Sequence, residues 1–363
     1  MDSRKFHIIR LRFKSPLHLS RGRPNTYDHA ENRLHSDTLK SAIFVSALQL
    51  GIPDIGENFF RAFRLSSAFP FFRKEDGRHL YFFPAPRVPK LPIRIKEDGE
   101  KNTDAESRRL KKLGRVEYLE EQLFRAVING DQGITLENRN FSSSGRLAAL
   151  QENLYDIKLY ETYTYQHVTK QVEEGEQPVP FYVEKLFFTE RSGLFFLYEG
   201  EEALLREKVL PAIRLMGDNG IGLDKGTGNG RFEPEIDKER IEFPSPADPS
   251  NQYSLSLYCP TEQEASSALS GVYGLEKRGG YITHPANPEH WQARKKSVYM
   301  LSEGSVFPYL EGRSGKLIDL RPDAAAMVAG NKPIVEHPIW RDGQGLFLPA
   351  NIPLQPHKHN GHE

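Results

Sequence analysis

The position of one glycine-rich stretch restricts the fold of this chain more than any other feature of its sequence. Residues 219–232 read NGIGLDKGTGNGRF, with five glycines around a lone lysine, Lys225. Apolar patterning predicts a helix before this stretch, over residues 201–217, and a strand after it, over residues 231–243. A Rossmann glycine turn has the opposite order, because it leaves a strand and opens a helix. We therefore do not expect a dinucleotide-binding loop, and no G-x-x-x-x-G-K-[ST] motif occurs in the chain.

Two interpretations of this stretch remain open. It could be a passive connector, although connectors are usually rich in serine and this one carries Lys225 and Arg231. Alternatively, it is a loop that holds the phosphates of a polyanion. In that case the backbone N–H groups of Gly226, Gly228 and Gly230 would act together with the two cations.

The order of predicted elements over residues 1–243 indicates an antiparallel sheet with helices on one face. Apart from residues 86–178, it reads as a β-α-β-β-α-β unit, which RNA-recognition modules share with many unrelated proteins. The predicted elements are a strand over 6–15, a helix over 36–50, a hairpin over 65–86 with Asp76-Gly77 as its turn, a hairpin over 179–200 around Ser192-Gly193, a helix over 201–217 that Pro211 kinks or divides, and a strand over 231–243.

Two other regions interrupt or follow this unit. Residues 86–178 are rich in charge and proline and predict an insertion or irregular subdomain with a short helix near residues 118–130. Residues 243–252, with three prolines, are the expected linker to a second domain over residues 253–350. The second domain should contain strands over 253–260, 296–307 and 345–352 and helices over 262–270 and 323–330, and residues 351–363 are expected to be a disordered tail.

The composition limits the class of protein. Lysine plus arginine and aspartate plus glutamate both number 49, so a nucleic-acid binder defined by bulk charge is excluded, whereas a local basic groove is not. A single cysteine, Cys259, excludes a disulfide framework. The charged N-terminus is no signal peptide, and no apolar run is long enough for a membrane span. We expect a soluble, cytoplasmic protein with no membrane partner.

The start of the first helix, His35-Ser36-Asp37, is a second candidate site. Ser36 or Asp37 could simply cap the helix. A helix N-terminus with Lys40 one turn inside it could instead bind a phosphate. From Arg4 to Lys40 there are nine basic and three acidic residues, a local excess that includes the loop cations Arg21, Arg23 and Arg33.

His35 could also act as a general base, since histidine moves protons near neutral pH. Metal-independent RNA cleavage also requires an acid, and the sequence shows no evident second group. The clustered carboxylates of a two-metal nuclease are absent as well, so we predict no metal or cofactor. The aromatic run LYETYTYQHV over residues 159–168 could stack RNA bases or could be an ordinary strand.

Three sequence blocks in this order resemble the RAMP superfamily of CRISPR proteins. They are HSDTLKSA from residue 35, LSSAFPFF from residue 65 with YFFPAP from residue 81, and RLMGDNGIGLDKGTGNGRFE from residue 214. More narrowly, the chain is similar to the fourth Csm subunit, the cap-like protein of type III-A interference complexes. The family usually has an apolar residue where Lys40 stands, and its loop reads closer to G-G-K-R-S-S-G.

The resemblance implies an α+β fold of two ferredoxin-like domains, the first with a long insertion and the second degenerate. It also implies a role without catalysis, in which the chain binds the repeat-derived 5′ tag of the guide RNA (crRNA) in a groove between its domains. The partners would be the large polymerase-like subunit and the adjacent backbone RAMP subunit.

We therefore predict an RNA-binding scaffold subunit used in antiviral defence. One rival is a metal-independent RAMP endoribonuclease that processes the CRISPR transcript with His35 as base. Another is a protein-only interaction module in which the glycine-rich stretch is a hinge. The expected RNA contacts are Arg21, Arg23, His35, Ser36, Lys40, Lys225, Gly226, Gly228, Gly230 and Arg231, with Arg139, Arg146 and Lys170 added from the insertion.

Overall fold

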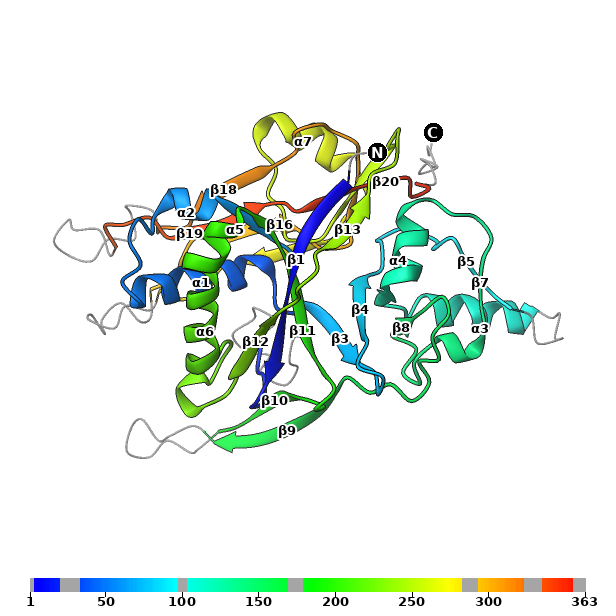
Figure 1. Ribbon diagram of the computed structural model, residues 1–363, viewed down its shortest axis with the longest axis horizontal. Coiled ribbons are helices and arrows are strands. Elements are labelled where there is room, and N and C mark those ends of the chain that lie inside the picture. The colour runs from blue at the N-terminus through cyan, green and yellow to red at the C-terminus, as the bar shows by residue number, and fades with distance from the viewer. Residues whose placement is uncertain are drawn as a thin grey trace.

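A large, mainly antiparallel sheet dominates the computed structural model, which describes residues 3–19, 33–96, 103–168, 179–282, 293–322 and 335–354. Its strand order is β12-β1-β11-β3-β4-β6-β8, with β13 also paired to β1 and β2 to β11. With the few helices around this sheet, the protein has a mixed α/β fold (Figure 1). The strands are β1 (Ser3–Phe13), β2 (Phe63–Leu65), β3 (Phe69–Arg73), β4 (His79–Pro84), β6 (Tyr118–Glu120), β8 (Leu147–Ala148), β11 (Ser192–Gly200), β12 (Phe232–Ile236) and β13 (Ile241–Pro244).

The central strands β1 and β11 are buried on both faces, and their side chains alternate between two cores. In β1, Ile8 belongs to one hydrophobic cluster and Ile9 to the other, and in β11 Phe195 and Phe196 divide in the same way. This alternation follows from the two-residue period of a strand. One core lies under α1 (Ser36–Gln49) and α6 (Leu210–Asn219), which contact each other and cover one face of the sheet (Figure 1).

The predicted helix over residues 201–217 is divided, as Pro211 indicated. A short segment, α5 (Glu202–Leu204), leads into a π-helical turn, η2 (Leu205–Val209), and Pro211 then lies in the first turn of α6. Proline has no N–H to donate, so it is tolerated in a first turn, where that donor would have no helical partner. The first hairpin is also confirmed, since β3 pairs with β4 and Gly77 adopts φ +85° in the turn.

The second predicted hairpin is wrong in its pairing. Both strands exist, but β10 (Pro180–Phe188) pairs with β9 (Tyr160–Val168), whereas β11 lies between β1 and β3. The turn is also displaced, because Ser192 and Gly193 already belong to β11. β11 is buried along most of its length and pairs with β1 on one edge and β3 on the other, so no edge is left for β10 over Leu194–Phe195.

Residues 86–178 are not merely an insertion outside the sheet, because β6 and β8 extend the large sheet beyond β4. The short helix expected near residues 118–130 is present as α4, and its Leu123 and Phe124 are fully buried in the second core. The other elements of this region are β5 (Ile93–Ile95), α3 (Thr103–Leu113), α4 (Glu121–Ile128), β7 (Ile134–Leu136) and η1 (Asn138–Asn140).

The described residues of the C-terminal part form three small sheets, β17-β14-β20, β15-β16 and β18-β19, and not one larger sheet. Tyr253 and Leu348 nevertheless belong to the same core as Phe83 and Phe124, so one core includes residues on both sides of the expected linker. The expected helix over 323–330 lies outside the described residues. The elements are β14 (Asn251–Ser254), α7 (Glu262–Leu269), β15 (Leu275–Arg278), β16 (Val298–Leu301), β17 (Val306–Pro308), β18 (Gly315–Asp319), β19 (Trp340–Gln344) and β20 (Phe347–Ala350).

Candidate nucleic-acid interface

The base of the glycine-rich loop is a compact structure that requires glycine. Gly230 has φ +70°, and a Cβ added there would lie 1.9 Å from the carbonyl oxygen of Ile221. The two legs of the loop approach so closely that the Ile221 N–H donates to the Gly230 carbonyl at 3.0 Å. The Gly230 N–H donates in turn to Pro16 at 2.7 Å, which fixes the loop to the segment after β1.

The tip of the loop is exposed. It contains a short 3-10 turn, η3 (Lys225–Thr227), and a Cβ added at Gly226 or Gly228 would meet no described atom within 4 Å. Asp224 enters this turn with φ +58°, and its carboxylate lies 3.1 Å from the ring of His18. The loop is therefore held at its base while its tip faces solvent.

Not every glycine has the role expected from the sequence. The Gly228 N–H donates to the Lys225 carbonyl at 3.0 Å, and the Gly230 N–H is used at the base of the loop. Neither N–H is available to a phosphate in this structure. Their predicted role as phosphate donors is corrected accordingly, whereas Gly226 stays a candidate.

Basic side chains from three separate segments gather around the loop. Arg231 is exposed at the end of the loop, and its carbonyl accepts a hydrogen bond from the N–H of Lys14, which follows β1, is also exposed and pairs with Glu233 at 2.9 Å. Lys185 in β10 lies 3.3 Å from the side-chain oxygen of Asn229. Lys14 and Lys185 were not singled out in the sequence, because their proximity depends on pairings distant along the chain.

The β9–β10 hairpin adds exposed aromatic side chains to these cations. Tyr163 and Tyr165 are 51% and 43% exposed, and both lie on the face of the hairpin that carries Lys185. The ammonium of Lys185 is 5.5 Å from the centre of the Tyr165 ring. The hairpin lies beyond the end of β1, at the bottom of Figure 1. We define the loop–hairpin surface as Lys14, Tyr163, Tyr165, Lys185, Lys225, Gly226 and Arg231.

The second candidate site, at the start of α1, is buried against the C-terminal part of the chain. His35, Ser36 and Lys40 are at most 3% exposed. The His35 ring lies 2.8 Å from a carboxylate oxygen of Glu303, and the Lys40 ammonium lies 3.0 Å from Asp342. Their predicted RNA contacts are therefore corrected, because no surface is left on which a phosphate could reach them.

Asp37 is the centre of this buried contact. Its carboxylate lies 2.9 Å from both Arg278 and Arg341. Burial alone would raise the pKa of Asp37, but the two guanidinium groups outweigh burial and lower the pKa to about 2. Glu303 behaves similarly, since His35 and Arg33 lower its pKa despite its burial. We call this set the helix-start junction, which comprises Arg33, His35, Ser36, Asp37, Lys40, Arg278, Glu303, Arg341 and Asp342.

The junction also corrects the idea that His35 acts as a general base. A base must reach the proton that it removes, and the His35 ring is enclosed beside Glu303. The described side chains include no group of three or more His, Cys, Asp or Glu residues placed to hold a metal ion. Within the described ranges, no helix combines the length and apolar character needed to cross a membrane.

The remaining predicted RNA contacts lie outside both the loop–hairpin surface and the helix-start junction. Arg146 pairs with Glu117 at 2.6 Å and donates to the hydroxyl of Tyr160 at the base of β9. Arg139 is exposed and borders a separate hollow, which is considered below. Arg21, Arg23 and Lys170 lie outside the described residues.

Comparison with known proteins finds similarity to one family. Residues 247–350 match the family model of the CRISPR Csm4 C-terminal domain. Over 281 residues the chain is 26% identical to the "CRISPR system Cms protein Csm4" of Thermococcus onnurineus strain NA1, a match that covers 75% of this chain and 80% of that protein.

The fold is similar to chains in two solved assemblies. A chain of the Csm3–Csm4 subcomplex of the type III-A interference complex superposes with a TM-score of 0.60 at 17% identity, covering 96% of this chain and 100% of that one. A chain of a Csm1–Csm4 cassette in complex with cA4 gives a TM-score of 0.57 at 17% identity, covering 97% and 100%. Fold and sequence together support one class, a RAMP-like subunit of a type III CRISPR complex. Within that class the matches support a Csm4 subunit, which confirms the resemblance seen in its sequence.

Proposed function

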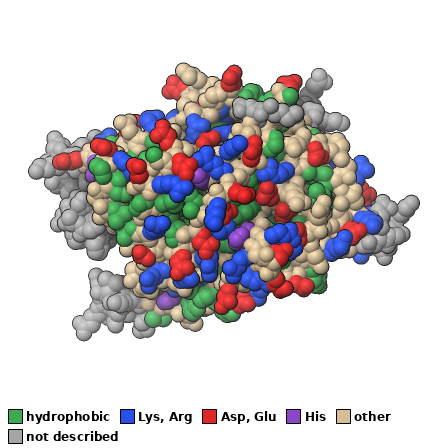
Figure 2. Space-filling view, viewed as in Figure 1, with side chains coloured by type: hydrophobic (Ala, Val, Ile, Leu, Met, Phe, Trp, Pro, Cys, Tyr) green, Lys and Arg blue, Asp and Glu red, His purple; other side chains and the backbone are tan. Residues whose placement is uncertain are grey.

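We propose that this chain is a scaffold subunit without catalysis that binds the 5′ tag of the guide RNA at its loop–hairpin surface. The observation that carries this proposal is the gathering of four basic side chains and two exposed tyrosines from three separate segments. The chain as a whole has no net charge. Figure 2 shows cationic and anionic side chains interspersed over the face in view, so a local surface must provide the attraction.

The chemistry of the surface suits a single strand of RNA. Basic side chains neutralise phosphates, and exposed tyrosines provide faces on which unpaired bases stack. Lys225, Gly226 and Arg231 would contact the backbone of the tag, while Tyr163 and Tyr165 would contact its bases. The helix-start junction fills part of the space between the N-terminal and C-terminal parts, so we place the tag on the loop–hairpin surface and not at the junction.

We infer the protein partners of this chain from the solved assemblies of similar chains. One of these assemblies is described as a Csm1–Csm4 cassette and another as a Csm3–Csm4 subcomplex. We propose that this chain docks the large polymerase-like subunit and the adjacent backbone RAMP subunit in the same way. The strand order β12-β1-β11-β3, with α1 and α6 on one face, supports a ferredoxin-like first domain. A degenerate ferredoxin-like second domain stays a proposal from the family.

Replacing Lys225 and Arg231 together by glutamate should weaken binding of single-stranded tag RNA by about 10- to 100-fold near 0.1 M salt. Two phosphate contacts are removed, so the slope of log K against log salt should become shallower by about 1.4. Fluorescence anisotropy with the full chain, alone and bound to its large partner, measures both values. Lys238→Glu is the matched control, since Lys238 is exposed beyond the opposite end of β12 and should leave affinity within about twofold of wild type.

Two results would favour the rival functions. Unchanged tag affinity in the double variant would reject the loop–hairpin surface, and no RNA affinity in the wild-type chain or its complex would favour a protein-only module. Incubation of the purified chain with repeat RNA and EDTA tests the endoribonuclease. Site-specific cleavage that His35→Ala abolishes would contradict the scaffold role.

A further inference from the structure

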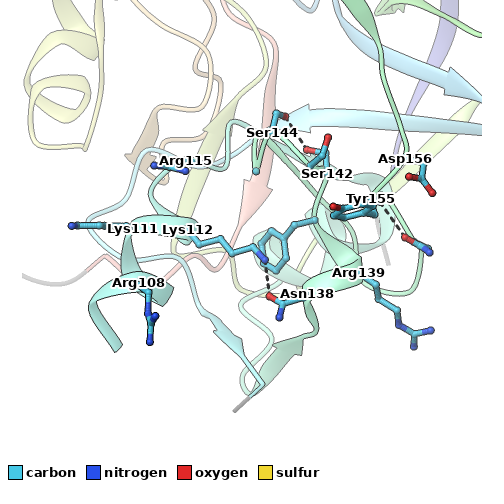
Figure 3. Close-up of a pocket in the computed structure, with 14 residues that line it drawn as sticks. Arg108, Lys111, Lys112, Arg115, Asn138, Arg139, Ser142, Ser144, Tyr155 and Asp156 are labelled. Atoms are coloured by element: carbon cyan, nitrogen blue, oxygen red, sulfur yellow. Dashed lines mark hydrogen bonds between the residues drawn. The ribbon is translucent and has the colours of Figure 1, made fainter. Parts of the chain in front are cut away.

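A basic hollow lies near β8, at the end of the sheet away from the glycine-rich loop. Its volume is about 680 Å³, and it is bounded by α3, the segment 138–145 and the segment 153–156. Figure 3 shows the α3 cations on one side of this hollow and Tyr155 and Arg139 on the other. Asp156 is the acidic residue among the described lining. Five basic residues also line the hollow: Arg108, Lys111, Lys112, Arg115 and Arg139.

The basic residues from α3 recur at a spacing that is unfavourable for the helix itself. Arg108, Lys111 and Lys112 stand at i, i+3 and i+4 within α3, so the helix brings them to one side, and Arg115 follows two residues after its end. Like charges at these spacings destabilise a helix. Lys111 and Arg115 form no ion pair with any side chain in the described ranges, so their charges are not neutralised locally.

The rest of the hollow offers aromatic and hydroxyl groups. The Lys112 ammonium lies 4.4 Å from the centre of the Phe141 ring and donates to Asn138 at 2.7 Å, so it is held in place (Figure 3). The hydroxyls of Ser142 and Ser144 are 3.1 Å apart on the same wall. Tyr155 is 61% exposed at the rim. A concave site with cations, hydroxyls and an exposed ring differs from the mixed charges of an ordinary solvated face.

We propose that this hollow binds one nucleotide of a single-stranded RNA. Its volume lies within the range of small-ligand sites. Lys111 and Arg115 would hold the phosphate, the base would stack on Tyr155, and the serine hydroxyls would hydrogen-bond the sugar or the base. A lipid surface would require a flat or convex face, and an acidic peptide would make no use of the exposed ring.

The hollow is a second RNA contact that goes beyond the proposed function. Along the strand order it lies about six inter-strand spacings from β12, or roughly 30 Å, so it cannot hold the same nucleotide as the loop–hairpin surface. It therefore predicts that an RNA strand is held at two places on this chain. Either contact could exist without the other.

Tyr155→Ala, and separately Lys111→Glu with Arg115→Glu, should each weaken binding of a fluorescein-labelled ten-nucleotide single-stranded RNA by about tenfold. These side chains are exposed, so folding should be preserved, which circular dichroism checks. The controls are Tyr309→Ala, also an exposed tyrosine, and Lys238→Glu, and both should keep wild-type affinity. The measurements use the full chain in its complex and alone.

The variants separate this inference from the proposed function. If the hollow variants bind RNA like wild type while Lys225→Glu with Arg231→Glu weakens binding, the hollow proposal is overturned and the loop–hairpin surface stands. If only the hollow variants weaken binding, the loop–hairpin surface is rejected and the hollow proposal stands. ATP or an acidic peptide that binds wild type and loses affinity in the hollow variants, with RNA affinity unchanged, would also overturn the proposal.

Discussion

Asp37→Ala is expected to lower the free energy of unfolding by about 3 kcal/mol. The change removes a fully buried carboxylate and leaves Arg278 and Arg341 facing each other without their shared partner. Urea denaturation measures the loss. Asp218→Ala is the matched control, because Asp218 is exposed near the end of α6 and should change stability by less than about 0.5 kcal/mol.

This experiment also tests the correction made to the start of α1. If the helix-start junction holds the C-terminal part in place, Asp37→Ala should lose stability, and RNA affinity should fall only as far as the protein unfolds. A variant with wild-type stability and lost RNA affinity would contradict the junction. It would restore the interpretation in which the start of α1 contacts a phosphate.

Gly230→Ala is expected to disrupt the glycine-rich loop and to weaken tag RNA binding by tenfold or more. A Cβ at this position would collide with the Ile221 carbonyl oxygen and would also require a left-handed backbone. These two costs together should lower the free energy of unfolding by about 2–4 kcal/mol unless the loop rearranges. Thermal denaturation and fluorescence anisotropy on the same preparation measure both consequences.

Gly226→Ala provides the comparison within the same loop. A Cβ there would meet no described atom within 4 Å, so stability should stay within about 0.5 kcal/mol of wild type. If both alanine variants behaved alike, the division of the loop into a fixed base and an open tip would be wrong. Normal affinity in a well-folded Gly230→Ala variant would show that RNA does not depend on the loop conformation.

Features with a local cause could be predicted from the sequence. The division of a helix at Pro211 follows from its missing N–H, and the turn at Gly77 follows from its tolerance of positive φ. The helix-loop-strand order around Lys225 depended on patterns within about thirty residues. These signals were enough to predict an antiparallel sheet with two covering helices and the glycine-rich loop before β12, but not all of the strand pairings in that sheet.

Features that depend on distant pairings could not be predicted. His35 and Lys40 looked like phosphate ligands because nothing near them in the sequence indicates that Glu303 and Asp342 bury them. In the same way, a hairpin of β10 with β11 was a reasonable prediction until β11 proved to have both edges occupied. Neither case had a local signal that reasoning from one sequence could use.

The basic hollow could be predicted only in part. The i, i+3, i+4, i+7 spacing of Arg108, Lys111, Lys112 and Arg115 is visible in the sequence, but the charge and proline content around them predicts an irregular insertion. Recognising the helix would have placed Arg108 and Lys111 on one side. The approach of Phe141 and Tyr155 to that side depends on the fold and could be found only in the structure.

The central claim is that guide RNA lies on the loop–hairpin surface, and photo-crosslinking tests it most directly. Tag RNA carrying 4-thiouridine would be bound to the assembled complex, irradiated, and the crosslinked peptides of this chain identified by mass spectrometry. We predict crosslinks to the β9–β10 hairpin around Tyr163 and Tyr165 and to the loop around Lys225. Crosslinks confined to peptides away from this surface, such as those around Lys238, would contradict the claim.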